Sequence, residues 1–176
     1  MNAMALPMKD NVTSISRAMP DHLAPVFAQF PLEVVDAEGV YLHTPSGRRV
    51  LDLYGGHAVA ALGYNHPRWV EALTSQARSL CFQSNAVPLD VRRRAATKLA
   101  KFCGLGLDTV FFINSGAEAN ENALKIACKV TNGTEIVAIE GGFHGRTAAA
   151  GAVTWGAEKK WYGFPDKPFD VKFIKP

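Results

Sequence analysis

Two short polar segments carry residue types that could bind a phosphorylated aromatic molecule. In the first, Ser115, Gly116 and Ala117 follow the apolar run at residues 110–113, and Glu118 comes three residues after the serine. This spacing is a capping box, which begins a helix and leaves backbone N–H groups of the first turn available to an anion. Gly116 has no Cβ to obstruct a close approach. The segment therefore predicts a phosphate site at a helix N-terminus.

The second polar segment, residues 141–146, offers groups that would complement such a phosphate site. Phe143 presents a flat ring that could stack on a planar ligand, and Arg146 carries a guanidinium fork that fits a carboxylate. Taken singly, these side chains have commoner roles: a core phenylalanine, an ion-paired or solvated arginine and, for His144, a hydrogen-bonded structural histidine. Together, phosphate, ring and carboxylate suggest a phosphorylated aromatic cofactor that carries an amino-acid substrate.

The hydrophobic pattern predicts elements that would bring the two segments together. Residues 110–113 and 136–139 are short apolar runs, typical of strands that are buried on both faces. Between them, apolar residues recur at helical spacing until Asn132-Gly133, at positions Ala119, Ala123, Ile126, Ala127 and Val130. Strand, helix and strand predict a parallel βαβ unit, in which both polar segments follow strand ends and face one edge of the sheet.

The remaining pattern predicts an α/β protein in which a small β-hairpin precedes an incomplete parallel sheet. Three β-prone runs predict antiparallel pairing with a turn at residues 44–47, and they lie at 34–35, 40–42 and 50–53. Helices are also expected from Pro67, from about Leu89 and over 148–153. One more parallel strand is expected over 171–174.

Length, charge and cysteine content argue against several other classes of protein. The chain has 176 residues, 48% of them hydrophobic, which suits a globular domain. A net charge of +3 is small, and the arginines at 92–94 fit the solvated face of a helix, so nucleic acid is not an expected partner. Cys81, Cys103 and Cys128 indicate neither a disulfide framework nor a metal site, which fits a reduced cytoplasm. No apolar run predicts a membrane span.

Two motifs resemble those of one enzyme family. Residues 114–127 read Asn-Ser-Gly-Ala-Glu-Ala-Asn-Glu-Asn-Ala-Leu-Lys-Ile-Ala, and residues 142–147 read Gly-Phe-His-Gly-Arg-Thr. Both resemble the class III, fold-type I aminotransferases that use pyridoxal 5'-phosphate (PLP), and most of all the acetylornithine aminotransferase branch. Residues 52–59, 61–67 and 84–85 resemble family segments as well, so the likeness extends from about Leu23 onward.

The resemblance implies a role for each candidate residue. Gly116 and Ala117, next to Ser115, would bind the cofactor phosphate, Phe143 would stack on the pyridine ring, and Arg146 would take the substrate α-carboxylate. The implied reaction moves an amino group from acetylornithine or a related amino acid to 2-oxoglutarate, in a homodimer when the protein is full length.

The resemblance also implies what the sequence lacks. The family's lysine that bonds to PLP, and the aspartate that pairs with its pyridine nitrogen, lie further along the chain than this sequence extends. No catalytic residue is therefore assigned, and Lys125 is interpreted as the ion-pair partner of Glu121 at i, i+4. We expect an N-terminal fragment that is inactive alone.

The expected organisation of this fragment has three parts. They are a mobile arm over residues 1–19, the N-terminal part of a small domain over 20–60, and the N-terminal part of the large PLP-binding domain over 61–176.

Two alternative functions stay open. One is a different class III PLP reaction, such as that of an aminomutase, and the other is a non-catalytic remnant.

Overall fold

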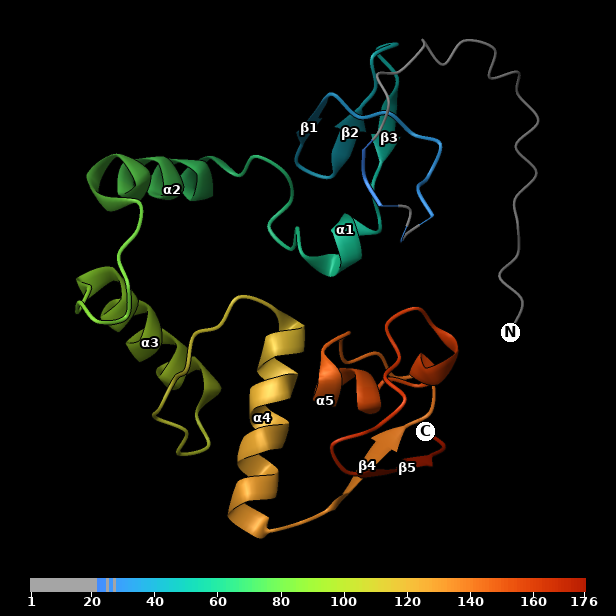
Figure 1. The fold of residues 1–176 in the computed structure, drawn as a ribbon. Coiled ribbons are helices and arrows are strands. Elements are labelled where there is room, and N and C mark those ends of the chain that lie inside the picture. The colour runs from blue at the N-terminus through green and yellow to red at the C-terminus, as the bar shows by residue number, and fades with distance from the viewer. Residues whose placement is uncertain (1–21, 25, 27) are drawn as a thin grey trace. The chain divides into compact units, whose positions relative to one another are not determined.

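The computed structural model describes residues 22–24, 26 and 28–176, and it divides into two compact units between Gln83 and Ser84 (Figure 1). The arm expected over residues 1–19 lies outside the described residues. The domain boundary expected at residue 60 concerns the complete family fold and stays a prediction. Each unit is described below by itself.

The first unit contains a three-stranded antiparallel sheet in the order β1-β2-β3. Its strands are β1 (Asp36–Glu38), β2 (Tyr41–His43) and β3 (Arg49–Leu51). The turn after β2 is closed by Thr44, whose carbonyl accepts from the N–H of Gly47 at 2.9 Å and whose hydroxyl accepts from the N–H of Arg48 at 3.1 Å. The antiparallel hairpin predicted from the runs at 40–42 and 50–53 is therefore confirmed. The run at 34–35 is not a strand, because the pairing with β2 begins after it, at Asp36 opposite His43.

Asp52 organises the chain that follows this sheet. Its carboxylate accepts hydrogen bonds from the hydroxyl of Tyr64 at 2.5 Å and from the backbone N–H groups of Tyr54 at 2.8 Å and Gly55 at 3.0 Å. The bond from Tyr64 is the main cause that lowers the pKa of the Asp52 carboxyl, and it raises the pKa of Tyr64 in turn. A short left-handed turn, α1 (Gly55–Ala58), whose four residues all have positive φ, follows Asp52. Helix α2 (Pro67–Leu80), which begins at a proline as predicted, completes the unit.

The second unit contains three helices, one short 3₁₀-helix and a pair of parallel strands. In chain order they are α3 (Asp90–Cys103), α4 (Gly116–Thr131), β4 (Glu135–Ile139), α5 (Ala148–Ala152), η1 (Ala157–Lys159) and β5 (Asp170–Ile174). Strand β4 pairs with β5 in parallel, from Glu135 opposite Asp170 to Ile139 opposite Ile174. The strands predicted at 136–139 and 171–174 are thus confirmed, and α5 lies in the connection between them. None of the described helices is both long and apolar enough to cross a membrane.

The strand predicted at residues 110–113 is wrong for this structure. These residues belong to no strand, and β4 and β5 are the only members of their sheet within the described part of the chain. A strand forms only where a neighbouring segment receives its backbone hydrogen bonds, and none pairs with this run. Phe111 is accordingly 65% exposed. The βαβ unit that the structure does contain is β4, α5 and β5.

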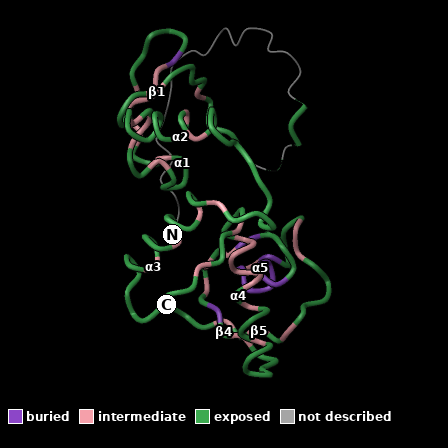
Figure 2. Tube along the Cα trace, turned by 90° about the vertical axis from the view of Figure 1, so that its left-hand side faces the viewer, coloured by how far each residue is buried: buried purple, intermediate pink, exposed green. Residues whose placement is uncertain are grey.

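Most buried residues of the second unit gather around α5, where Figure 2 shows the largest purple region. Small side chains dominate this core, and they are Ala138, Ala149, Ala150, Ala152, Val153 and Ala157. Trp155 lies beside the core, with its ring 4.9 Å from that of Phe173 on β5. The core is therefore built of alanines that let backbones approach closely, rather than of large apolar side chains.

Helix α4 packs against this core with a face other than the one that its apolar stripe indicated. Ala117, Asn120 and Glu121 lie on the face toward α5 and the preceding loop. Most of the stripe, namely Ala119, Ala123, Ile126 and Val130, is turned away from this face, since successive residues turn by about 100°. Ile126 is 58% and Val130 76% exposed. Polar contacts and small residues, not the apolar stripe, hold α4 in place in this structure.

Candidate active site

The N-terminus of α4 forms the capping box that the sequence predicted. Ser115 has an extended backbone (φ −153°, ψ 160°), and its hydroxyl oxygen accepts from the N–H of Glu118 at 3.1 Å. The Glu118 carboxylate reaches back one residue further than in the usual box. It accepts from the backbone N–H of Asn114 at 2.9 Å and from the Asn114 side chain at 3.1 Å. This double link fixes the turn from which the helix starts.

The first two N–H groups of α4 are available to a ligand. In the described part of the chain, no group accepts from the N–H of Gly116 or Ala117, whereas the next two N–H groups bond to Ser115. No atom lies within 4 Å of the position that a Cβ on Gly116 would take. The Ser115 hydroxyl accepts one bond and keeps its own hydrogen to donate. Two amides, a hydroxyl and the positive end of a helix of 16 residues can therefore meet an anion here.

The loop between β4 and α5 lies directly against this helix end. Gly145 has a φ of 136°, and a Cβ built on it would lie 2.8 Å from the Cα of Ala117 and 2.6 Å from its Cβ. The Asn120 side chain donates to the His144 carbonyl at 2.7 Å. The two polar segments singled out in the sequence therefore meet, although the strand expected to precede the first one is absent.

Thr154, at the far end of α5, fixes the same loop from the other side. The side chain is 3% exposed, and its hydroxyl oxygen accepts from the N–H of His144 at 3.0 Å. The same oxygen lies 3.1 Å from the carbonyl of Gly145 and 3.0 Å from that of Ala150, to either of which it can donate. Both backbone groups of His144 are therefore bonded, which gives this residue a structural part through its backbone.

Phe143 and Arg146, the proposed ring platform and carboxylate partner, are on the surface of this loop. The side chain of Phe143 is 63% exposed, so it is not a core residue here and its ring is open to a ligand. Arg146 is also exposed and immediately precedes Thr147, the residue at the N-cap position of α5.

Glu121 is the residue of this region whose role the sequence did not reveal. One carboxylate oxygen, Oε2, accepts from the Thr147 hydroxyl at 2.7 Å and from the N–H groups of Ala149 at 2.8 Å and Ala150 at 3.2 Å. Its other oxygen lies 3.5 Å from Nζ of Lys125, which confirms the predicted i, i+4 pair. Glu121 of α4 thus caps α5, whose N-cap residue, Thr147, makes no side-chain cap of its own.

These contacts lower the pKa of Glu121. Partial burial, the largest single effect, raises it, because the side chain is only 14% exposed. The hydrogen bonds from Thr147, Ala150 and Ala149, with the charge of Lys125, outweigh that effect, so that the pKa of this carboxyl lies below the ordinary 4.5. Glu121 is therefore a carboxylate at neutral pH.

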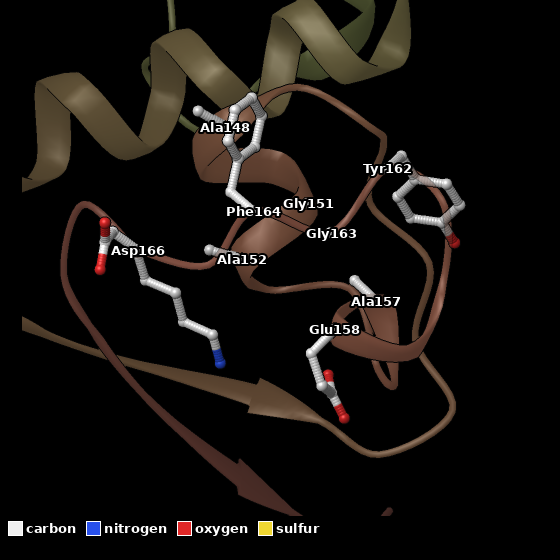
Figure 3. Close-up of a pocket in the computed structure, with 10 residues that line it drawn as sticks. Ala148, Gly151, Ala152, Ala157, Glu158, Tyr162, Gly163, Phe164 and Asp166 are labelled. Atoms are coloured by element: carbon white, nitrogen blue, oxygen red, sulfur yellow. The ribbon is translucent and has the colours of Figure 1, made fainter.

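A separate small cavity lies beside α5 and η1, lined among others by Ala152, Ala157, Tyr162 and Phe164 (Figure 3). Its volume of about 10 Å³ is roughly that of one water molecule, so it is a packing feature and not a ligand site. Within the part of the chain that the structure describes, no three histidine, cysteine, aspartate or glutamate residues are grouped to hold a metal ion.

Comparison with known proteins gives this geometry a family. A family model described as Aminotransferase class-III matches residues 23–176. An acetylornithine aminotransferase from Methanopyrus kandleri is 41% identical over 132 residues, which are 75% of this chain and 34% of that protein. A putative LysW-aminoadipate semialdehyde/glutamate semialdehyde transaminase from Pyrococcus horikoshii is 37% identical over 151 residues, covering 82% of this chain and 41% of that protein.

A solved structure supports the same assignment. The taurine:2-oxoglutarate aminotransferase from Bifidobacterium kashiwanohense, in complex with PLP and glutamate, matches with a TM-score of 0.74 at 28% identity. The match covers 81% of this chain and 32% of that one. The chain therefore belongs to the class III aminotransferases, a fold-type I family whose cofactor is PLP. It spans about a third to two fifths of the length of the relatives named here.

A first prediction concerns the close approach of the loop to α4. Gly145→Ala should push the loop away from Ala117 and destabilise the second unit by about 1–3 kcal/mol, because the added methyl has no space. Gly141→Ala is the matched control: Gly141 also has a positive φ, of 79°, but no atom lies within 4 Å of its Cβ position. Chemical denaturation of both variants measures the difference. Equal losses of stability would show that the approach is loose.

A second prediction concerns pH. Because the folded-state pKa of Glu121 is lowered, its contribution to stability is complete above about pH 4.5 and is lost as the pH falls through the lower folded value. The difference in unfolding free energy between the wild type and Glu121→Gln should therefore be constant near neutral pH and narrow below pH 4.5. Denaturation curves at several pH values measure it, and a difference independent of pH would contradict the assigned charge.

Proposed function

We propose that the N-terminus of α4 and the loop before α5 form part of the PLP site of a class III aminotransferase. The N–H groups of Gly116 and Ala117 and the hydroxyl of Ser115 hold the phosphate, and Phe143 stacks on the pyridine ring. The observation that carries the proposal is the pair of N–H groups that have no acceptor among the described residues and lie next to a loop bearing an exposed aromatic ring. Each charge-assisted bond to the phosphate contributes about 1.5–3 kcal/mol.

The same loop orients the substrate. Arg146 lies three residues after the stacking phenylalanine, so its guanidinium can bind the α-carboxylate of an amino acid whose amino group approaches the ring. When bound, PLP would supply the electron sink for the reaction at the substrate carbon that bears the transferred amino group. The described residues contribute binding and orientation.

For the whole protein, we propose the transfer of an amino group from acetylornithine or a related amino acid to 2-oxoglutarate. The relative from Methanopyrus kandleri, named acetylornithine aminotransferase, supports this substrate. The name of the Pyrococcus horikoshii relative supports a related amino acid as the alternative. A homodimer in the cytoplasm completes the proposal, supported by the motif resemblance and, for the compartment, by three cysteines without a disulfide.

A third prediction tests the phosphate site. Gly116→Pro removes one N–H group from the first helical position, where proline is well accepted, and the extended backbone of Ser115 suits a following proline. The variant should keep the stability of the chain but bind PLP about tenfold more weakly, the loss expected for one charge-assisted bond. Isothermal titration calorimetry on the 176-residue chain measures this affinity.

Pyridoxal, which lacks the phosphate, is the control ligand for this variant. Its affinity should be the same for the wild type and for Gly116→Pro, since the lost N–H group contacts only the phosphate. A chain that binds PLP no more tightly than pyridoxal has no phosphate site at α4, and that result would remove the proposal.

A fourth prediction separates the candidate reactions in the complete enzyme. An aminotransferase should form glutamate from 2-oxoglutarate with acetylornithine as donor, and omission of 2-oxoglutarate should stop turnover. Conversion of an amino acid without any 2-oxo acid would instead indicate an aminomutase. Cofactor binding with no turnover of any donor would indicate a non-catalytic remnant.

A further inference from the structure

We propose that Glu121 is a positioning residue of the PLP site, which holds the loop bearing Phe143 and Arg146 at a fixed distance from the N–H groups of α4. The proposal rests on the function proposed above for those groups. Glu121 itself contacts neither the phosphate nor the ring. It sets the distance between the N-terminus of α4 and the loop, which do contact them.

The hydrogen bonds at the start of α5 run to a carboxylate on another helix. Thr147 immediately precedes α5, yet its side chain makes no capping hydrogen bond to this helix. The carboxylate of Glu121 takes that place from another helix, with three bonds of 2.7, 2.8 and 3.2 Å on a single oxygen. A cap supplied from α4 joins the two helices, whereas a cap from the segment before α5 would only have stabilised the N-terminus of α5.

The link between Glu121 and Thr147 lies close to both parts of the candidate site. Glu121 is one helical turn beyond Ala117 on the same face of α4, and Thr147 directly follows Arg146. Asn120 makes a second link, to the carbonyl of His144, and so the loop is fastened at two points. A ligand that contacts both the helix end and the loop then meets groups that are already ordered, which reduces the entropy cost of binding.

The cap and the ion pair use different oxygens of the Glu121 carboxylate. Lys125 lies 3.5 Å from the other carboxylate oxygen, and its side chain is 65% exposed. An ion pair exposed to solvent in this way contributes little. Loss of Lys125 should therefore leave the position of the loop unchanged, whereas loss of reach at Glu121 should not.

The test compares reach with charge. Glu121→Asp keeps the charge but is one methylene too short to reach α5, and Glu121→Gln keeps the reach and an accepting oxygen without the charge. Lys125→Met is the control. The affinity of each variant of the 176-residue chain is measured by calorimetry for PLP and for inorganic phosphate, which needs only the helix end.

The expected result is selective. Glu121→Asp should weaken PLP binding about tenfold and leave phosphate binding within about twofold, as expected for loss of hydrogen bonds to a charged group remote from the phosphate. Glu121→Gln should stay within about threefold of the wild type for both ligands, and Lys125→Met should match the wild type.

Other outcomes overturn the proposal. Wild-type affinity for PLP in Glu121→Asp would show that the link does not set the position of the loop. Equal loss of both ligands, including loss through misfolding, would give Glu121 a role in stability alone. A wild-type chain that binds neither ligand would refute the phosphate site itself, and this result is distinct from the other two.

Discussion

The packing of α4 against the loop and first turn of α5 is the constraint on which the candidate site depends. Ala117 and Gly145 approach so closely that no additional side-chain atom fits between them. Asn120 and Glu121 then fasten the two backbones with hydrogen bonds. Small residues permit the approach and polar ones fix it, so two segments distant in sequence present their binding groups together.

Features determined by short-range chemistry could be predicted from the sequence. The capping box at Ser115, the left-handed residue Asn132 that ends α4, and the positions of strands β4 and β5 each follow from residue types within a few positions of one another. The candidate site residues were selected on the same basis. Their proximity follows from the close approach of Gly145 to Ala117.

Features that depend on a distant partner could not be predicted in this way. The run at residues 110–113 has the composition of a buried strand, but composition does not supply the neighbour that a strand needs. The sequence likewise indicated Glu121 only as the partner of Lys125, because that contact is local. Its bonds to Thr147, Ala149 and Ala150 span more than 25 residues, and no spacing rule reports them.

The most direct test of cofactor binding at the N-terminus of α4 is to follow backbone amides by two-dimensional ¹H–¹⁵N NMR while PLP is added to the chain. The amide signals of Gly116 and Ala117 should shift most, because their hydrogens bond to the phosphate. Those of the loop from Phe143 to Arg146 should shift next. Unchanged signals at Gly116 and Ala117, with the largest changes elsewhere or none at all, would contradict the central claim that this helix end binds the cofactor.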